Sequence, residues 1–289
     1  MDGGWPTAGL AIDEAGSLYG TTLGGGEQSC ESGGCGVVFE LTRTAVGWKE
    51  TVLHTFQGTD GTGAYTGVTL VPASIDGGPT KRSPAIFGTT LYGGDGYSGA
   101  LTGGGVVFQL VNYRGRWTYR TLYEFSSHAG RPGGPPIIDK SGILYDMNSL
   151  GGIGNGAVFE LRPTGLTETG WEEADIYSFR GPPADGWFGL YQGVVMDRGG
   201  NLYGTTSSGG SSQNCFGGCG TVFRLSKTQG KWAESDLYSL TGGAAGSGPL
   251  SGVILGRDGL VYGMTPFGGD ASCSGDGQPG CGVVFRISP

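Results

Sequence analysis

The stretch Asp197-Arg198-Gly199-Gly200-Asn201-Leu202-Tyr203-Gly204-Thr205-Thr206 decides the fold of this chain, because weaker copies of it recur along the sequence. Its glycines and asparagine tolerate positive φ and predict a tight turn. The following Leu-Tyr-Gly-Thr-Thr is typical of a short strand. The aromatic residue returns at intervals of 68, 58, 58 and 59 residues, at Tyr19, Phe87, Tyr145, Tyr203 and Tyr262. A repeat of about 60 residues therefore organises the chain.

Three further short segments recur with the same period. In the first copy they are Gly9–Asp13, before the tyrosine motif, and Gly36–Leu41 and Trp48–Phe56, after it. Each is rich in β-branched and aromatic residues and is bounded by turn-forming residues, which is typical of strands. Four antiparallel strands in every repeat describe a propeller blade. The sequence therefore predicts an all-β, five-bladed β-propeller that forms a single domain over 1–289, with repeats at about 1–57, 58–126, 127–180, 181–241 and 242–289.

The fourth strand of the repeat occurs only four times, because the sequence stops soon after the third strand of the last copy. Two alternatives follow for the fifth blade. Either it has three strands and lacks the outer one, or the chain has lost N-terminal residues that would supply that strand.

The glycine content fits a folded chain. Glycine accounts for 64 of 289 residues, against a usual share of ~7%. Hydrophobic residues reach 37% and charged residues only 15%, the opposite of the balance found in disordered chains. Collagen is excluded because there is no strict Gly-X-Y period. A helical bundle is excluded because glycine and proline interrupt most of the chain.

Charge and hydropathy exclude two classes of partner. The net charge of -8 argues against nucleic acid, whose phosphates require clustered Lys and Arg. No run approaches the ~20 apolar residues of a membrane-spanning helix. Met1–Trp5 lacks the basic and apolar segments of a leader, so we expect that a signal peptide was removed or that the sequence is a fragment. We expect no anchor sequence within this chain, and we expect a monomer.

The six cysteines form three local pairs at one position of the repeat, between the second and third strands. The pairs are Cys30/Cys35, Cys215/Cys219 and Cys273/Cys281. Zinc sites favour paired Cys-x-x-Cys motifs or nearby histidines, and neither is present. We therefore predict three disulfides within loops, and a location outside the cytosol.

The repeat resembles a known family. The block Asp197–Thr206 is followed by Gly-Thr-Val-Phe-x-Leu at Gly220–Leu225, and a Leu-Tyr-Ser-Phe motif is approximated by Ile176–Phe179. These residues resemble the GloVer (Gloeo/Verruco) tandem repeat of bacterial surface proteins. The resemblance implies an exported, surface-associated, β-propeller-like protein, and it carries no established activity.

Two copies depart from this pattern. The third has Asp146 in place of glycine and Met147-Asn148 in place of Thr-Thr. The second has an insertion, Ala73–Ser83, between its first two strands.

The sequence supplies no catalytic constellation. His54 stands where three other repeats have tyrosine, which predicts a packed ring, and His128 has no accompanying nucleophile elbow. Asp13, Asp139 and Asp197 end equivalent strands, which indicates a structural role in the turn. We therefore assign no catalytic residue, no metal ligand and no cofactor, while calcium held by loop carbonyls stays open.

Aromatic and acidic residues gather on one predicted face. In an up-and-down blade, the loops between second and third strands emerge on the same face as the connections between repeats. Rings and acids on a rim held by disulfides suit carbohydrate or peptide binding. The candidate ligand-binding residues are Trp5, Asp60, Tyr65, Tyr97, Asp185, Trp187, Phe216 and Phe267. The structural alternative is that Trp5 and Trp187 wedge between blades.

The preferred interpretation is an extracellular or cell-surface binding or scaffold module for a carbohydrate or protein ligand. One alternative is a glycan-active hydrolase or lyase that uses carboxylates on the loop-rich face. Another is a purely structural surface array. An enzyme requires a deep pocket with carboxylates that break the repeat pattern, a binder requires an exposed aromatic patch, and an array requires neither.

Overall fold

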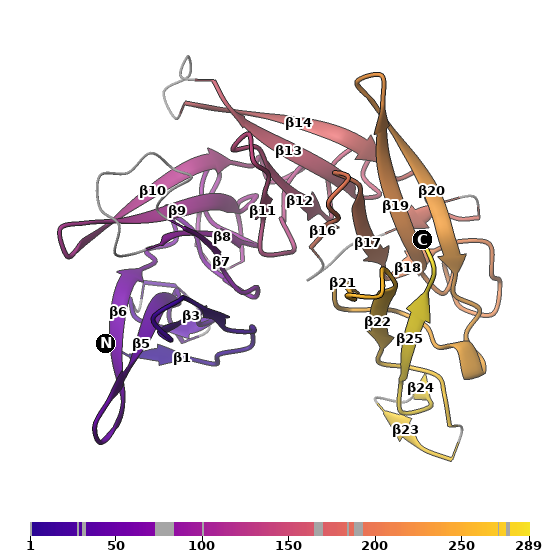
Figure 1. Cartoon of the computed structure of the whole chain (residues 1–289), viewed down its shortest axis with the longest axis horizontal. Coiled ribbons are helices and arrows are strands. Elements are labelled where there is room, and N and C mark those ends of the chain that lie inside the picture. The colour runs from indigo at the N-terminus through magenta and orange to yellow at the C-terminus, as the bar shows by residue number, and fades with distance from the viewer. Residues whose placement is uncertain are drawn as a thin grey trace. The chain divides into compact units, whose positions relative to one another are not determined.

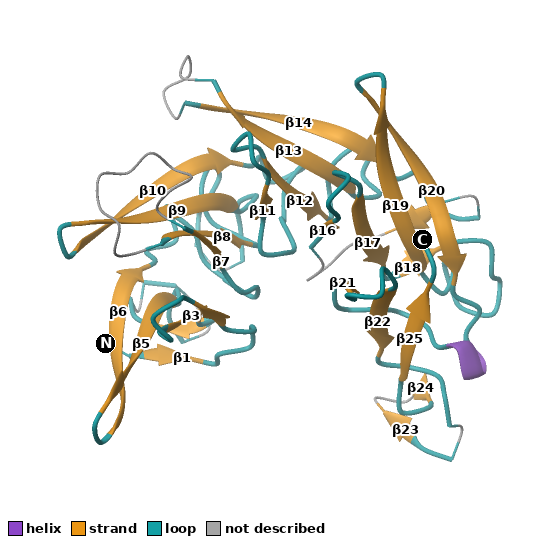
Figure 2. Cartoon of the chain, in the orientation of Figure 1, coloured by secondary structure: helices purple, strands orange, loops and turns teal. Residues whose placement is uncertain are grey.

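The computed structural model describes residues 2–27, 29–30, 33–72, 84–99, 101–164, 170–183, 185–187, 193–270, 272–275 and 278–289. Within these ranges the chain consists of strands and loops, with one short 3-10 turn at Gly243–Ala245 (Figure 2). The chain is an all-β protein of the five-bladed β-propeller class, and each sequence repeat forms one main antiparallel sheet, beside which short two-stranded pairs occur. The predicted insertion Ala73–Ser83 lies outside the described residues.

The first four sheets have four strands each, paired in the order of the sequence (Figure 1). The first contains β2 (Ala11–Ile12), β3 (Leu18–Thr21), β5 (Val37–Thr44) and β6 (Gly47–Thr55). The second contains β7 (Thr69–Val71), β8 (Ala85–Thr90), β9 (Val106–Tyr113) and β10 (Arg116–Glu124). The third contains β11 (Ile137–Ile138), β12 (Leu144–Asn148), β13 (Ala157–Pro163) and β14 (Trp171–Ser178). The fourth contains β16 (Val195–Met196), β17 (Leu202–Thr206), β19 (Thr221–Thr228) and β20 (Lys231–Ser239).

The fifth sheet has three strands among the described residues. They are β21 (Ile254–Leu255), β22 (Val261–Thr265) and β25 (Val283–Ile287), paired in that order. As both alternatives predict, the last sheet therefore lacks the outer strand that the other four sheets have.

The turn between the first two strands is organised by the aspartate of the repeat. Oδ1 of Asp197 accepts the backbone N–H groups of Gly199 and Asn201, at 2.8 and 2.9 Å. Its Oδ2 accepts the hydroxyl of Tyr203 at 3.0 Å. Burial acts to raise the pKa of Asp197, but the hydrogen bonds from Asn201, Tyr203 and Gly199 lower it overall. The predicted turn role of this aspartate is thus present in the structure, and Asp13 and Asp139 bond their own turns in the same way.

The chain divides into two compact units, which are described separately. Unit 1 comprises Met1–Leu144 and Leu161–Glu173, and unit 2 comprises Tyr145–Glu160 and Ala174–Pro289. The core of unit 1 includes Tyr19, Val38, Phe56, Ile86 and Phe108, each at most 2% exposed. A core cluster of unit 2 is built from Tyr203, Val222, Val253 and Val261. The single-domain organisation stays a prediction.

Threonines in the second strand of a sheet bond the backbone just before the first strand of the next sheet. In unit 1, the hydroxyl of Thr21 donates to the carbonyl of Thr66 at 2.7 Å, and that of Thr89 donates to the carbonyl of Gly134 at 2.8 Å. In unit 2, the hydroxyl of Thr205 donates to the carbonyl of Ser251 at 2.9 Å. These threonines are buried, so each bond joins consecutive blades away from solvent.

Candidate ligand-binding site

The connection that precedes a repeat pairs with the loop after that repeat's second strand. β1 (Gly3–Gly4) pairs with β4 (Gly24–Gly25), and β15 (Gly186–Trp187) pairs with β18 (Ser208–Gly209). In the second repeat the same contact is a single bridge between Thr62 and Tyr92. The two segments of the predicted face therefore lie together within each of these repeats.

All three predicted disulfides are present. They join Cys30 to Cys35, Cys215 to Cys219 and Cys273 to Cys281. Disulfides persist outside reducing compartments, so they indicate a non-cytoplasmic protein. No helix in the described part of the chain has the length and hydropathy needed to cross a membrane.

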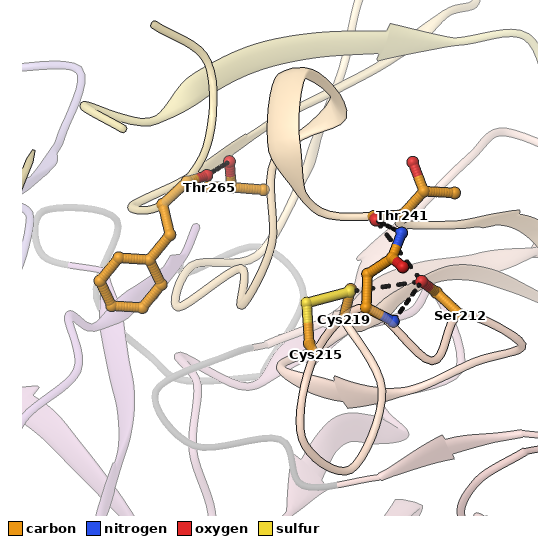
Figure 3. Close-up of a disulfide and its surroundings, with 7 residues drawn as sticks. Ser212, Cys215, Cys219, Thr241 and Thr265 are labelled. Atoms are coloured by element: carbon orange, nitrogen blue, oxygen red, sulfur yellow. Dashed lines mark hydrogen bonds between the residues drawn. A yellow bond between two sulfur atoms is a disulfide. The ribbon is translucent and has the colours of Figure 1, made fainter. Parts of the chain in front are cut away.

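The Cys215–Cys219 loop in the fourth repeat is tied to its surroundings on several sides (Figure 3). The side-chain amide of Asn214 donates to the carbonyl of Thr241 at 2.8 Å, which links the loop to the end of the outer strand β20. The N–H of Gly218 donates to the carbonyl of Cys215 at 3.1 Å and closes the loop internally. Gly217 lies beneath the Trp187 indole, so close that a Cβ there would lie 2.8 Å from Trp187 Cζ3.

Phe216 stands at the tip of this loop with its side chain fully exposed. It borders an open depression of about 440 Å³. The depression is lined by Pro182, Pro183, Gly210, Ser212, Gln213, Asn214, Cys215, Phe216, Gly217 and Gly218. Two of the predicted site residues therefore meet at one disulfide loop. The ring of Trp187, from β15, packs against Gly217 of the loop, and Phe216 projects from the loop into solvent.

Asp185 stabilises the turn that contains Pro182–Pro183, and these prolines form one wall of the depression. The residue is only 1% exposed. Its Oδ2 accepts the hydroxyl of Tyr177 at 2.7 Å and the N–H of Arg180 at 2.9 Å, while Oδ1 accepts the N–H of Gly186 at 2.6 Å. These bonds use the carboxylate inside the protein, so Asp185 positions the wall without facing solvent.

Asp60 has the same role in the second repeat. Its Oδ2 is 2.9 Å from Nε2 of His54, and its Oδ1 accepts the N–H of Gln57 at 2.7 Å. The His54 ring stacks on Tyr119, with ring centroids 3.8 Å apart, as expected for a packed ring. Asp60 thus closes a turn in unit 1.

The other predicted aromatic residues lie in their own repeats. Trp5 is 59% exposed and covers Gly24 and Gly33 beside the Cys30–Cys35 disulfide. The Tyr97 hydroxyl donates to Sγ of Cys30 at 3.2 Å. Tyr65 is half-buried near Gly63, and burial raises its pKa. Phe267 is half-buried and bridges Ser247 through its backbone.

A family model of the Gloeobacter/Verrucomicrobia repeat matches residues 74–289, about three quarters of the chain. This chain belongs to the Gloeobacter/Verrucomicrobia repeat family. No curated protein sequence matches it. Among solved structures, a candidate oxidoreductase (glucose dehydrogenase) from Thermus thermophilus is similar at 14% identity and a TM-score of 0.39, over 99% of this chain and 97% of that one. A protein of unknown function from Dyadobacter fermentans is similar at 12% identity and a TM-score of 0.47, over 97% and 81%.

This member of the repeat family also has an acidic cluster that the sequence patterns did not single out. The Tyr177 hydroxyl that bonds Asp185 lies 3.4 Å from Oε2 of Glu234. Burial, then the charges of Asp236 and Asp185, raises the pKa of Glu234 to about 7. Burial and the charge of Asp185 also raise the pKa of Asp236. The described residues contain no group of His, Cys, Asp and Glu arranged to hold a metal ion.

Sequence reasoning also missed the polar and proline residues of the depression. Gln213 and Asn214 lie just before Cys215, and Pro182–Pro183 lies in the connection that precedes the repeat. The position of Gln213 and Asn214 next to a cysteine pair could have indicated that they lie near a disulfide loop. Their spacing from the cysteines does not, however, distinguish them from the other polar residues of these loops.

Proposed function

We propose that this chain is an extracellular or cell-surface binding module whose ligand occupies the depression beside Phe216. One observation carries the proposal: a fully exposed phenylalanine is held at the tip of a disulfide-closed loop, at the edge of that depression. An exposed ring on a constrained loop loses little conformational entropy when a ligand covers it. Aromatic residues with nearby hydrogen-bonding groups are typical of ligand sites.

The lining of the depression favours binding over hydrolysis. Glycoside hydrolysis requires two carboxyl groups that flank the scissile bond. The described residues that line the depression include no carboxylate, and Asp185 is bonded within the turn. A purely structural array would not require an exposed aromatic ring at the edge of a depression.

The test is a binding screen of the purified chain with its disulfides intact, against immobilised glycans and unrelated peptides. Phe216→Ala is expected to weaken binding of the best ligand by at least about tenfold, because burying a phenylalanine contributes about 1.5–3 kcal/mol. Val46→Ala, at an equally exposed residue in the turn between β5 and β6, is the matched control and should bind unchanged. Absence of any ligand, or equal binding by the Phe216 variant, would overturn the proposal.

A further inference from the structure

We propose that the ligand of the depression is an uncharged glycan. This inference rests on the proposed function and goes one step further, because it names the chemical class that the site accepts. Its basis is the combination of an uncharged lining, one oriented amide and an exposed ring on one constrained loop.

The lining has no fixed charge. None of the described residues around the depression has an ionisable side chain, since its only cysteine is in a disulfide. The adjacent turn contains Arg180, whose Nε lies 3.4 Å from Oδ2 of Asp185, but Arg180 is not among the residues that line the depression. The described lining therefore offers an anionic sugar no cation, and the chain's net charge of -8 would repel it.

The polar groups of the lining suit sugar hydroxyls. The Nδ2 group of Asn214 donates to the carbonyl of Thr241, which fixes the amide and leaves Oδ1 as an acceptor. Gln213 is exposed, and its side chain offers both a donor and an acceptor. A hydroxyl group both donates and accepts, so it can satisfy either amide without any ionic contact.

The apolar groups suit the C–H face of a sugar ring. Phe216 presents a fully exposed ring, and Pro182–Pro183 forms an apolar wall in the same depression. An amphipathic sugar covers an aromatic ring with one face and uses its hydroxyl edge for hydrogen bonds. An extended peptide gains most from an open sheet edge, and the loop that carries Phe216 is closed on itself by its disulfide.

The experiment measures affinity by titration calorimetry for four classes of probe: neutral oligosaccharides of glucose and of N-acetylglucosamine, an oligouronate, a lysine-rich peptide and an aspartate-rich peptide. We expect one neutral oligosaccharide to bind most tightly. Its Kd should change less than about twofold between about 50 and about 500 mM salt, because no charge pair is screened.

Charge substitutions at Gln213 sharpen the test. Gln213→Lys and Gln213→Glu should each weaken the neutral ligand by about threefold to tenfold, the cost of one lost hydrogen bond. Gln57→Lys, at an exposed glutamine outside the depression, should leave binding unchanged.

Two results would overturn the glycan assignment and leave the binding function standing. In the first, the Gln213→Lys variant binds the oligouronate more tightly than the parent binds any neutral oligosaccharide. In the second, the Gln213→Glu variant binds one of the peptides more tightly than the parent does. Binding of none of the probes, with no ligand found in the wider screen, would overturn the proposed function itself.

Discussion

At the scale of single residues, four of the five repeats share one contact, a glycine packed beneath a phenylalanine. Gly204 pairs with Phe223 across β17 and β19, and a Cβ at Gly204 would lie 2.6 Å from Phe223 Cζ. Gly20, Gly88 and Gly263 meet an equivalent phenylalanine in the same way. The glycine of the Leu-Tyr-Gly-Thr-Thr motif is therefore required by ring packing within the sheet. Conformational freedom is not its role here.

Gly204→Ala is expected to lower the free energy of unfolding by about 1–3 kcal/mol, because the new methyl group would overpack a fully buried ring. Urea denaturation of the parent and the variant would measure the loss. Gly9→Ala is the matched control, since a Cβ at Gly9 has open space around it and should change stability by less than ~0.5 kcal/mol. Equal stabilities of the two variants would contradict this account.

Glu234 gives the fold a pH dependence. Its pKa is raised to about 7 by burial and by the neighbouring acids, so between about pH 4.5 and 7 the folded chain binds more protons than the unfolded chain. Protonated Glu234 therefore contributes its full stabilisation of the fold below about pH 4.5, and this contribution is lost as the pH rises to about 7.

Glu234→Gln is expected to raise stability at pH 8 by on the order of 1 kcal/mol, a value reduced for the solvent screening of a half-exposed side chain. At pH 5 the difference between the variant and the parent should be much smaller than at pH 8, which makes that measurement an internal control. Denaturation midpoints at both pH values provide the comparison. The assignment would be contradicted if the stability of the parent rises from pH 5 to pH 8 and the variant shows the same pH dependence.

At the scale of elements, loops supply the residues of the candidate site, and the conformation of these loops is harder to predict from the sequence than the strands are. The strands were predictable because tyrosine, glycine and phenylalanine recur with one period. Trp187 and Phe216 could be placed near a disulfide loop for the same reason. The internal hydrogen bonds of Asp60 and Asp185 could not be predicted, because their partners, His54 and Tyr177, belong to the preceding strand. Linear spacing does not show whether a loop carboxylate faces solvent or turns back to the protein.

The Cys215–Cys219 disulfide is expected to matter more for binding than for stability. Replacing both cysteines by serine opens a very short loop, so the free energy of unfolding should fall by less than ~3 kcal/mol. Ligand affinity should fall by about tenfold or more, because the Phe216 loop is no longer held in its binding conformation. Calorimetric titration with the best ligand and urea denaturation measure the two effects.

The equivalent replacement of Cys30 and Cys35 is the control for that prediction. It opens a loop of similar length in the other unit, where both cysteines belong to the core, so it should cost at least as much stability and leave binding at the Phe216 depression unchanged. Loss of affinity in both double variants would show that the Cys215–Cys219 loop has no special role.

At the scale of the whole molecule, the blades depend on bonds between neighbours. Second-strand threonines of the first, second and fourth sheets reach the backbone that leads into the next sheet, so each of these three blades is stabilised by the one that follows it. Stability in such repeated structures is the sum of intrinsic terms and nearest-neighbour terms. Loss of one link should therefore weaken its own pair of blades first.

Thr205→Val keeps the shape of the side chain and removes the hydroxyl that reaches Ser251. It is expected to lower the free energy of unfolding by about 0.5–1.5 kcal/mol, because the half-buried carbonyl of Ser251 loses its partner. Hydrogen exchange should show the largest loss of protection in β21 and β22. Thr51→Val, at an exposed position of β6, is the control and should leave both measurements nearly unchanged. Uniform loss of protection along the chain would contradict the nearest-neighbour account.

The disulfides have a consequence for how such chains change over evolutionary time. Each joins cysteines only 4 to 8 residues apart, so every crosslink begins and ends inside one repeat. Duplication or deletion of a complete repeat therefore carries both partners of a crosslink together, and leaves no orphaned thiol to mispair during export. Blade number and loop chemistry can diversify independently in a chain built this way.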